Sequence, residues 1–224
     1  MGLVAGGGGG IIFAMQPWHN WYHGMGNTYG TWPPGDGRGF RTRHHREHIE
    51  GDYKNPPPAG KYEEWLKRSR GRMGRAPVVL SMEQRRVACF EMVAKLLELK
   101  VEGVEACVTP VHFHVLARFS PWVEGSGGGG VQSPGIAMPG LCAGNMLRDG
   151  RDPLPRHCIG VAKKHVSHVL RARGLGVEGG GVWAVRSTVK PVTDRGHQLR
   201  VVEYLREHKE EGGVVWSEIK GFGS

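Results

Sequence analysis

Two histidines stand two residues apart in an otherwise apolar run, VHFHVLARF at positions 111–119. Alternate side chains of a β-strand point to the same face, so His112 and His114 would project together while their neighbours fill a core. Two neutral imidazoles held on one strand form a rigid pair of metal ligands. The other interpretation is a pair of histidines satisfied by hydrogen bonds on a wet sheet face, and the triplet alone favours that one.

A second pair of reactive side chains lies in VVEYLREHK, at positions 201–209. Tyr204 and His208 are four residues apart, which places them on one face of a helix. A tyrosine hydroxyl has a reference pKa of about 10 and becomes a useful nucleophile where a cation relieves the charge on the group under attack. His208 would complete a set of three imidazoles around such a cation. The alternative is that Tyr204 packs with Val201 and His208 lies in solvent.

The elements expected to hold these residues alternate between strands and helices. Ser81 is the expected N-cap of one helix, in which Val87, Phe90, Val93, Ala94 and Leu97 repeat at helical spacing. Asp194 is the expected N-cap of the helix that carries Tyr204. Strands are expected at 21–32, 104–110, 111–119 and 181–192, and helices at 81–100, 157–172 and 194–211. This order predicts an α+β domain, a ferredoxin-like antiparallel sheet with its helices on one face.

Gly/Pro-rich loop insertions interrupt that pattern. Residues 1–16 are expected to be a disordered Gly-rich tail, or to precede a true start at Met15. Residues 17–220 are expected to form a single domain. Within it, 33–77 is a basic loop elaboration with a short helix near EEWLKRSR, and 120–155 is a Gly-rich flexible insertion.

Composition narrows the class of partner. The 224 residues carry a formal charge of +9, which favours a polyanion such as nucleic acid. No run approaches the roughly 18 apolar residues of a membrane span, and no targeting signal stands out, so a cytoplasmic, nucleoid-associated protein is expected. The wide cysteine spacing makes a zinc ribbon improbable and predicts free thiols at Cys89, Cys107, Cys142 and Cys158.

Taken in order, the motifs resemble those of the single-tyrosine HUH transposases, in particular the REP-associated tyrosine transposases. The resemblance covers most of the chain from about Trp21 to Trp216. It rests on TYGTWPPGDGRGF, HIEGDYKNPPPAGKYE, VHFHVLARF, AKKHVSHVLR and VWAVRSTVKPVTDRGHQLRVVEYL. It implies an HUH endonuclease-type fold, in which a histidine–hydrophobic–histidine triplet binds the metal.

The resemblance also implies an activity and the residues that perform it. Enzymes of this family cleave single-stranded DNA near a small hairpin through a 5′-phosphotyrosine intermediate, and so act in DNA transposition and recombination. Carried over to this chain, Tyr204 is the nucleophile and His112 and His114 bind Mg²⁺ or Mn²⁺. The third ligand in the family is a polar residue four after the tyrosine, often Gln or Asn, and here that position holds His208.

Basic residues near these motifs are expected to contact the DNA. Lys190 and Arg195 stand close in sequence to the tyrosine helix, the 41–75 loop is the most basic region, and Trp65 offers a stacking platform for unpaired bases. Trp21 and Trp32 are expected in the core. The helix AKKHVSHVLRAR adds a basic face that would either contact DNA or lie in solvent, made of Lys163, Lys164, His165, His168 and Arg171.

Two other functions compete with the transposase. One is a catalytically inactive or domesticated protein of the same fold that binds single-stranded or hairpin DNA. The other is a related replication or relaxation nickase, which would bring further domains. Convergence of His112, His114, His208 and Tyr204 is expected for an enzyme. In dimeric relatives the tyrosine helix serves the partner's site, so a homodimer is among the expected assemblies.

Overall fold

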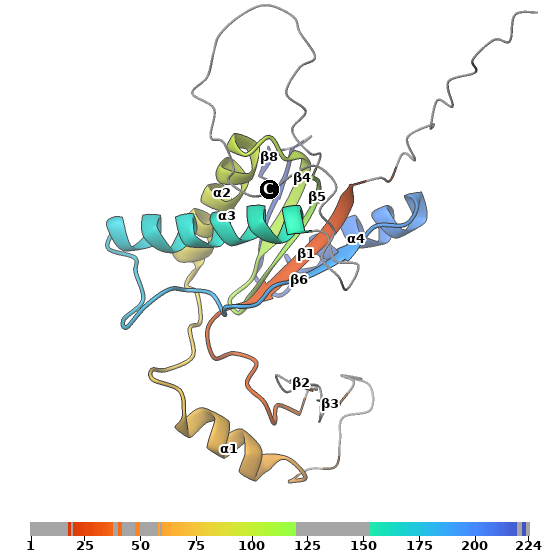
Figure 1. The fold of residues 1–224 in the computed structure, drawn as a ribbon. Coiled ribbons are helices and arrows are strands. Elements are labelled where there is room, and N and C mark those ends of the chain that lie inside the picture. The colour runs from red at the N-terminus through yellow and green to blue at the C-terminus, as the bar shows by residue number, and fades with distance from the viewer. Residues whose placement is uncertain are drawn as a thin grey trace, which may run out of the picture.

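A computed structural model describes residues 18, 20–37, 40–41, 48–49, 58, 60–119, 153–218 and 221–222 (Figure 1). The predicted tail at 1–16 and the cysteine at 142 lie outside these residues. The strands are β1 (Trp21–Asn27), β2 (Phe40–Arg41), β3 (His48–Ile49), β4 (Glu102–Val108), β5 (His112–Arg118), β6 (Thr188–Pro191), β7 (Val214–Ser217) and β8 (Gly221–Phe222). The helices are α1 (Glu63–Gly71), α2 (Met82–Glu98), α3 (Pro153–Ala172) and α4 (Arg195–Glu207).

The central feature is a six-stranded sheet in the order β6-β1-β5-β4-β7-β8. Every pairing in it is antiparallel, and β2 and β3 form a separate two-stranded pair. The α+β class and the predicted succession of β1, α2, β4, β5, α3, β6 and α4 are confirmed. The structure adds β7 and β8, the last of which lies beyond the domain limit predicted at 220. The HUH-type assignment of this fold stays a prediction.

The start of α2 is as predicted, and its buried face is predicted in part, at Val93 and Val87. Ser81 Oγ accepts a hydrogen bond from Gln84 N, and the Gln84 side-chain oxygen accepts one from Ser81 N, which completes a capping box. The predicted apolar stripe is wrong at Phe90 and Leu97, which are 52% and 37% exposed. The apolar residues of α2 lie on several sides of the helix, so their spacing alone could not show which side would pack on the sheet. The residues that pack on the sheet are Ala88, Cys89, Met92, Val93 and Leu96.

A tight turn joins β4 to β5 and fixes the start of the histidine strand. Thr109 N donates to His112 O over 2.9 Å, and Thr109 Oγ1 accepts from His112 N over 3.0 Å. Pro110 lies within this turn and donates nothing there, while its carbonyl accepts from Leu80 N. The two strands predicted on either side of Pro110 are therefore a hairpin, and His112 is the first residue of β5.

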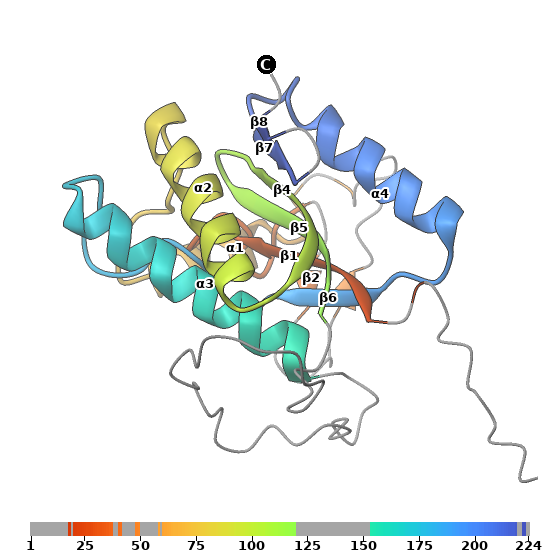
Figure 2. The same cartoon turned by 90° about the horizontal axis from the view of Figure 1, so that it is seen from above.

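Helices cover both faces of the sheet, which corrects the prediction that they share one face (Figure 2). On one face, α2 and α3 pack against Val104, Phe113 and Val115. A Cβ at Gly24 would collide with Cδ1 of Ile159, which shows that α3 packs closely on β1. On the other face, α4 forms a smaller cluster from Val201, Leu205, Cys107, Leu116, Val192 and Val215.

The loop predictions are partly confirmed. The short helix expected in the 33–77 segment is α1. The insertion predicted at 120–155 extends too far, because α3 begins at Pro153. The rest of that segment lies outside the described residues. The strand expected at 181–192 is shortened to β6, preceded by a bridge between Trp183 and Thr28. Cys89, Cys107 and Cys158 are reduced cysteines outside any disulfide, as predicted, and all three are buried.

Among the helices within the described residues, none has the length and apolar character that crossing a membrane requires.

Candidate metal centre

Three histidines from two elements converge on the face of the sheet that α4 covers. One ring nitrogen each of His112, His114 and His208 lies within 4.8 Å of the others. Their ring centroids are 4.8–4.9 Å apart. His208 Nε2 is buried and accepts no hydrogen bond from any group in the described part of the chain. A buried imidazole nitrogen in this state, beside two other imidazoles, is the arrangement that a metal ion satisfies.

The end of α4 positions His208 against β5. Asp194 caps the start of this helix, accepting from His197 N over 2.8 Å as predicted. His208 is the C-cap residue, and its carbonyl accepts from Gly213 N over 2.7 Å as the chain turns into β7. A Cβ at Gly213 would lie 2.6 Å from that carbonyl, so this approach requires glycine. The turn thereby holds His208 beside the β4–β5 hairpin.

Tyr204 lies one helical turn before His208 and beside the same imidazoles. Its ring centroid is 4.6 Å from that of His208 and 5.2 Å from that of His114. The side chain is 42% exposed, so the phenol borders both the histidine cluster and solvent. All four residues predicted to form the catalytic centre therefore come together within one chain.

A carboxylate orients His208 from outside the cluster. Glu211 Oε2 accepts from His208 Nδ1 across 2.9 Å. In the neutral form of His208, which carries one N–H, this hydrogen bond places the proton on Nδ1 and the lone pair on Nε2. Carboxylates that bind the outer nitrogen of a metal-ligating histidine hold its tautomer and ring orientation in this way. Sequence reasoning missed Glu211.

A fourth histidine, His23 of β1, extends the cluster and was also missed. Its Nε2 lies 3.0 Å from Nδ1 of His114. In the β1–β5 register His23 is opposite Leu116 while Met25 is opposite His114, so the two histidines are diagonal neighbours on one face. The sequence offered only a lone histidine next to Tyr22, and the pairing of β1 with β5 was needed to place it here.

Burial keeps this pair of histidines uncharged at neutral pH. Desolvation lowers the pKa of His23 from 6.5 to about 4, with Lys190 as the next cause. Desolvation also lowers the pKa of His114 to about 2, with His112 as the next cause. A neutral imidazole is the form that binds a metal, so the fold prepares His114 for coordination.

In the presence of a chelator, the free energy of unfolding should decrease as the pH falls from about 6.5 towards 4. The unfolded chain takes up protons on His23 and His114 that the folded chain excludes, so acid favours unfolding. Each histidine contributes about 1.4 kcal/mol per pH unit within its window. Urea denaturation across this range measures the slope. His23→Gln should remove one of the two histidine contributions, and an unchanged slope in that variant would contradict this account.

The predicted DNA-binding residues of α3 do not share one exposed face. Lys163 is buried, and its ammonium donates to Ala184 O, Val185 O and Ser187 Oγ over 2.7–3.2 Å. Burial lowers its pKa to about 8. Lys163 thus fixes the chain before β6, a structural role in place of the expected contact with DNA. Lys164, His168 and Arg171 are exposed.

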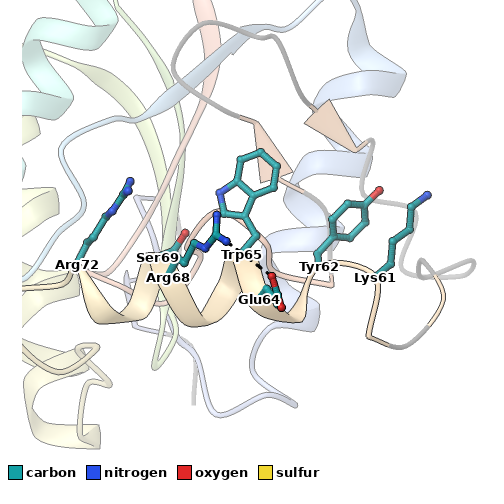
Figure 3. A pocket seen from close by; sticks show the side chains of 7 residues that line it. All are labelled: Lys61, Tyr62, Glu64, Trp65, Arg68, Ser69 and Arg72. Carbon is teal, nitrogen blue, oxygen red and sulfur yellow. Dashed lines mark ion pairs between the residues drawn. The ribbon is translucent and has the colours of Figure 1, made fainter.

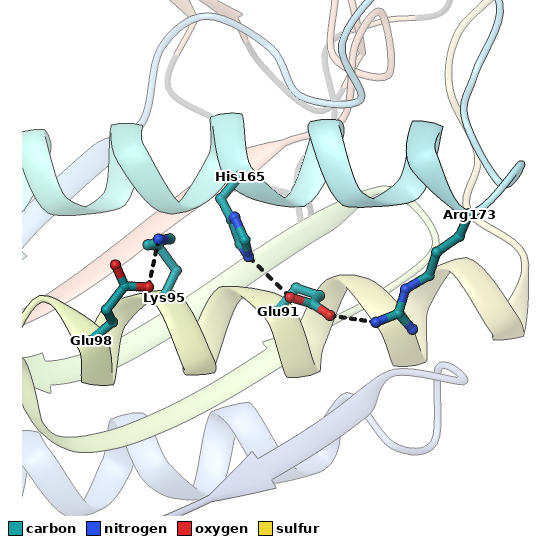
Figure 4. Close-up of polar contacts among 5 residues, drawn as sticks. All are labelled: Glu91, Lys95, Glu98, His165 and Arg173. Atoms are coloured by element: carbon teal, nitrogen blue, oxygen red, sulfur yellow. Dashed lines mark hydrogen bonds and ion pairs between the residues drawn. The ribbon is translucent and has the colours of Figure 1, made fainter.

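His165 also faces another helix. Its Nε2 lies 3.0 Å from Oε2 of Glu91 on α2, and Arg173 Nη2 donates to Oε1 of the same carboxylate over 2.7 Å (Figure 4). These contacts join α2 and α3 above the sheet. The helical periodicity identified the basic residues but not the carboxylate that engages them.

The sheet separates α3 from the histidine cluster, so the predicted DNA-binding residues form two groups. Exposed Lys190 of β6 is directly opposite His23 in the β1–β6 register and belongs to the cluster's face. Exposed Arg195 begins α4, nine residues or about 13 Å along the helix from Tyr204. Of the predicted set, Lys190 and Arg195 are the residues on the side where Tyr204 lies.

A basic and aromatic hollow of about 520 Å³ lies along α1 (Figure 3). Residues 61–72 carry five exposed cations and two exposed carboxylates, and none of the α1 side chains is buried. Trp32, expected in the core, is 39% exposed, whereas Trp21 packs against the α4 cluster. The residues lining the hollow are Lys61, Tyr62, Glu64, Trp65, Arg68, Ser69 and Arg72.

A comparison of the chain with protein-family models, with curated proteins and with solved structures finds no match.

Proposed function

We propose that this protein is a transposase of the single-tyrosine HUH type, which cleaves and rejoins single-stranded DNA through Tyr204. The observation that carries the proposal is the convergence of Tyr204 with the three imidazoles of His112, His114 and His208 within one chain. The motif order along the sequence, which resembles that of REP-associated tyrosine transposases, supports it independently.

The proposed reaction is a transesterification at phosphorus. Tyr204 Oη forms a bond to the scissile phosphorus as the bond to the 3′ oxygen breaks, and the phenolic proton is lost. The leaving 3′ oxygen takes up a proton, so the products are a 5′-phosphotyrosine and a free 3′-hydroxyl. Attack by a 3′-hydroxyl on the phosphotyrosine reverses the step and joins the strands without ATP.

A divalent cation held by the three histidines would polarise the phosphate and offset the charge that develops on it. Imidazole nitrogen is a softer ligand than the oxygens that Mg²⁺ prefers, so of the two expected ions this donor set favours Mn²⁺. The exposed Lys190 supplies a positive charge on the same face for the DNA backbone.

The test is a cleavage assay on labelled single-stranded hairpin DNA taken from the flanks of the protein's own gene. Wild-type protein with Mn²⁺ should release a fragment ending in a 3′-hydroxyl and retain the other fragment on the protein. Chelator should stop both, and Mg²⁺ should support less cleavage than Mn²⁺. Salt-sensitive binding with no cleavage by any flanking sequence would replace the transposase with a non-catalytic DNA-binding protein.

The hollow on α1 is proposed to hold unpaired bases of the same strand. Trp65 and Tyr62 offer aromatic faces, and Lys61, Arg68 and Arg72 surround them with positive charge. Trp65→Ala should therefore weaken binding of single-stranded DNA by about 1–3 kcal/mol, the usual worth of one stacked base. Fluorescence anisotropy with a labelled oligonucleotide measures the affinity.

The matched control for Trp65 is Trp32→Ala, which removes an exposed indole that does not line the hollow. This control should bind DNA as the wild type does. An equal loss in both variants, or no loss in Trp65→Ala, would remove α1 from the DNA interface.

A further inference from the structure

His23 touches the histidine cluster from β1 without belonging to the three-histidine set. It is 7% exposed, and its ring lies 5.2 Å from that of His114 and 6.4 Å from that of Tyr204. Its Nε2 lies 3.0 Å from His114 Nδ1, on the strand that pairs with β5. Two buried polar rings in hydrogen-bond contact must share one hydrogen between them.

We infer that His23 is a positioning residue, which holds His114 in the tautomer and orientation that direct its Nε2 towards a metal. The inference rests on the proposed metal site. When His114 offers the lone pair of Nε2, its single proton lies on Nδ1 and donates to His23 Nε2. Glu211 does the same for His208. His114 of β5 and His208 at the C-cap of α4 are thus each oriented by a hydrogen bond from outside the three-histidine set.

The position of His23 makes this role specific to that side chain. Trp21 and Met25 are the nearest residues of β1 on the same sheet face as His23. Neither carries a group that accepts a hydrogen bond strongly. Leu116 of β5 and Lys190 of β6 are opposite His23 in the two strand pairings, and neither offers a hydrogen-bond acceptor to His114. His23 is therefore the residue of this part of β1 that can accept the Nδ1 proton of His114.

The experiment titrates Mn²⁺ alone into three variants and follows the free ion by electron paramagnetic resonance. His23→Leu preserves approximate volume but removes the acceptor, and should bind Mn²⁺ about 10- to 100-fold more weakly than the wild type. His23→Gln places an amide oxygen where Nε2 lies, and should restore most of that affinity. Ser217→Ala is the control, because it removes another buried hydrogen bond, the 2.6 Å contact with Glu105, away from the histidines.

The outcomes separate this inference from the proposed function. Weakened Mn²⁺ binding in His23→Leu, rescue in His23→Gln and no change in Ser217→Ala would support it, even if no DNA is cleaved. Equal affinity in His23→Leu and the wild type would overturn it and leave the metal site intact. Equal losses in all three variants would reduce His23 to a structural residue. A wild-type protein that binds no Mn²⁺ would overturn the inference together with the site.

Discussion

Tyr204→Phe should abolish covalent attachment of DNA, reducing strand cleavage by at least about 10³-fold, the scale seen when a nucleophile is removed. The substitution deletes one oxygen atom and preserves the aromatic ring beside His114 and His208. Metal affinity and DNA affinity should therefore stay unchanged, because neither requires the hydroxyl. A denaturing gel with labelled hairpin DNA and Mn²⁺ measures the adduct.

The control for this variant is Tyr22→Phe, which removes a hydroxyl from the opposite face of the sheet, where Tyr22 packs near Phe119. That variant should form adduct as the wild type does. If Tyr204→Phe cleaved DNA at a rate near that of the wild type, the nucleophile would be water directed to the phosphate by the histidine cluster. That result would rule out strand transfer through Tyr204.

His114→Ala should have the largest effect on metal binding. His114 lies at the middle of the cluster, stacked on His208 with an interplanar angle of 18° and next to His112. Its loss leaves only His112 and His208 of the three imidazoles, so the ion would have one ligand fewer. Mn²⁺ at 100 times its dissociation constant should stabilise the wild type by about 2.7 kcal/mol and should leave the stability of this variant unchanged.

The measurement is the melting temperature with Mn²⁺ and with chelator, compared within each variant. This within-variant comparison cancels the cost of the cavity that alanine leaves. His168→Ala is the control, because it removes an exposed histidine from α3 on the other face of the sheet. A metal-induced shift in His114→Ala equal to that of the wild type would place the ion elsewhere.

The sequence determined much of the candidate centre because its ligands obey short periodicities. A spacing of two on a strand placed His112 with His114, and a spacing of four on a helix placed Tyr204 with His208. Neither periodicity could bring the two pairs together. That contact depends on the turn at Gly213 and on α4 packing against the sheet face opposite α2 and α3.

Long-range pairing explains what sequence reasoning missed. His23 and His114 are 91 residues apart and meet only through the β1–β5 register. In the sequence, Lys163 is one more cation on a basic helix. Its burial depends on hydrogen bonds to the carbonyls of Ala184 and Val185, which the spacing along the helix does not indicate. The buried face of α2 was misassigned in part for a similar reason. Its apolar residues lie on several sides of the helix, and contact with the sheet determines which of them are buried.

The most direct test of the central claim is to locate the DNA on the protein. Wild-type protein would be incubated with hairpin DNA and Mn²⁺, digested with nuclease and protease, and analysed by mass spectrometry. We expect a nucleotide remnant linked through phosphate to the peptide that contains Tyr204, and none when chelator replaces Mn²⁺. A remnant on another residue, or cleaved DNA with no protein adduct, would contradict it.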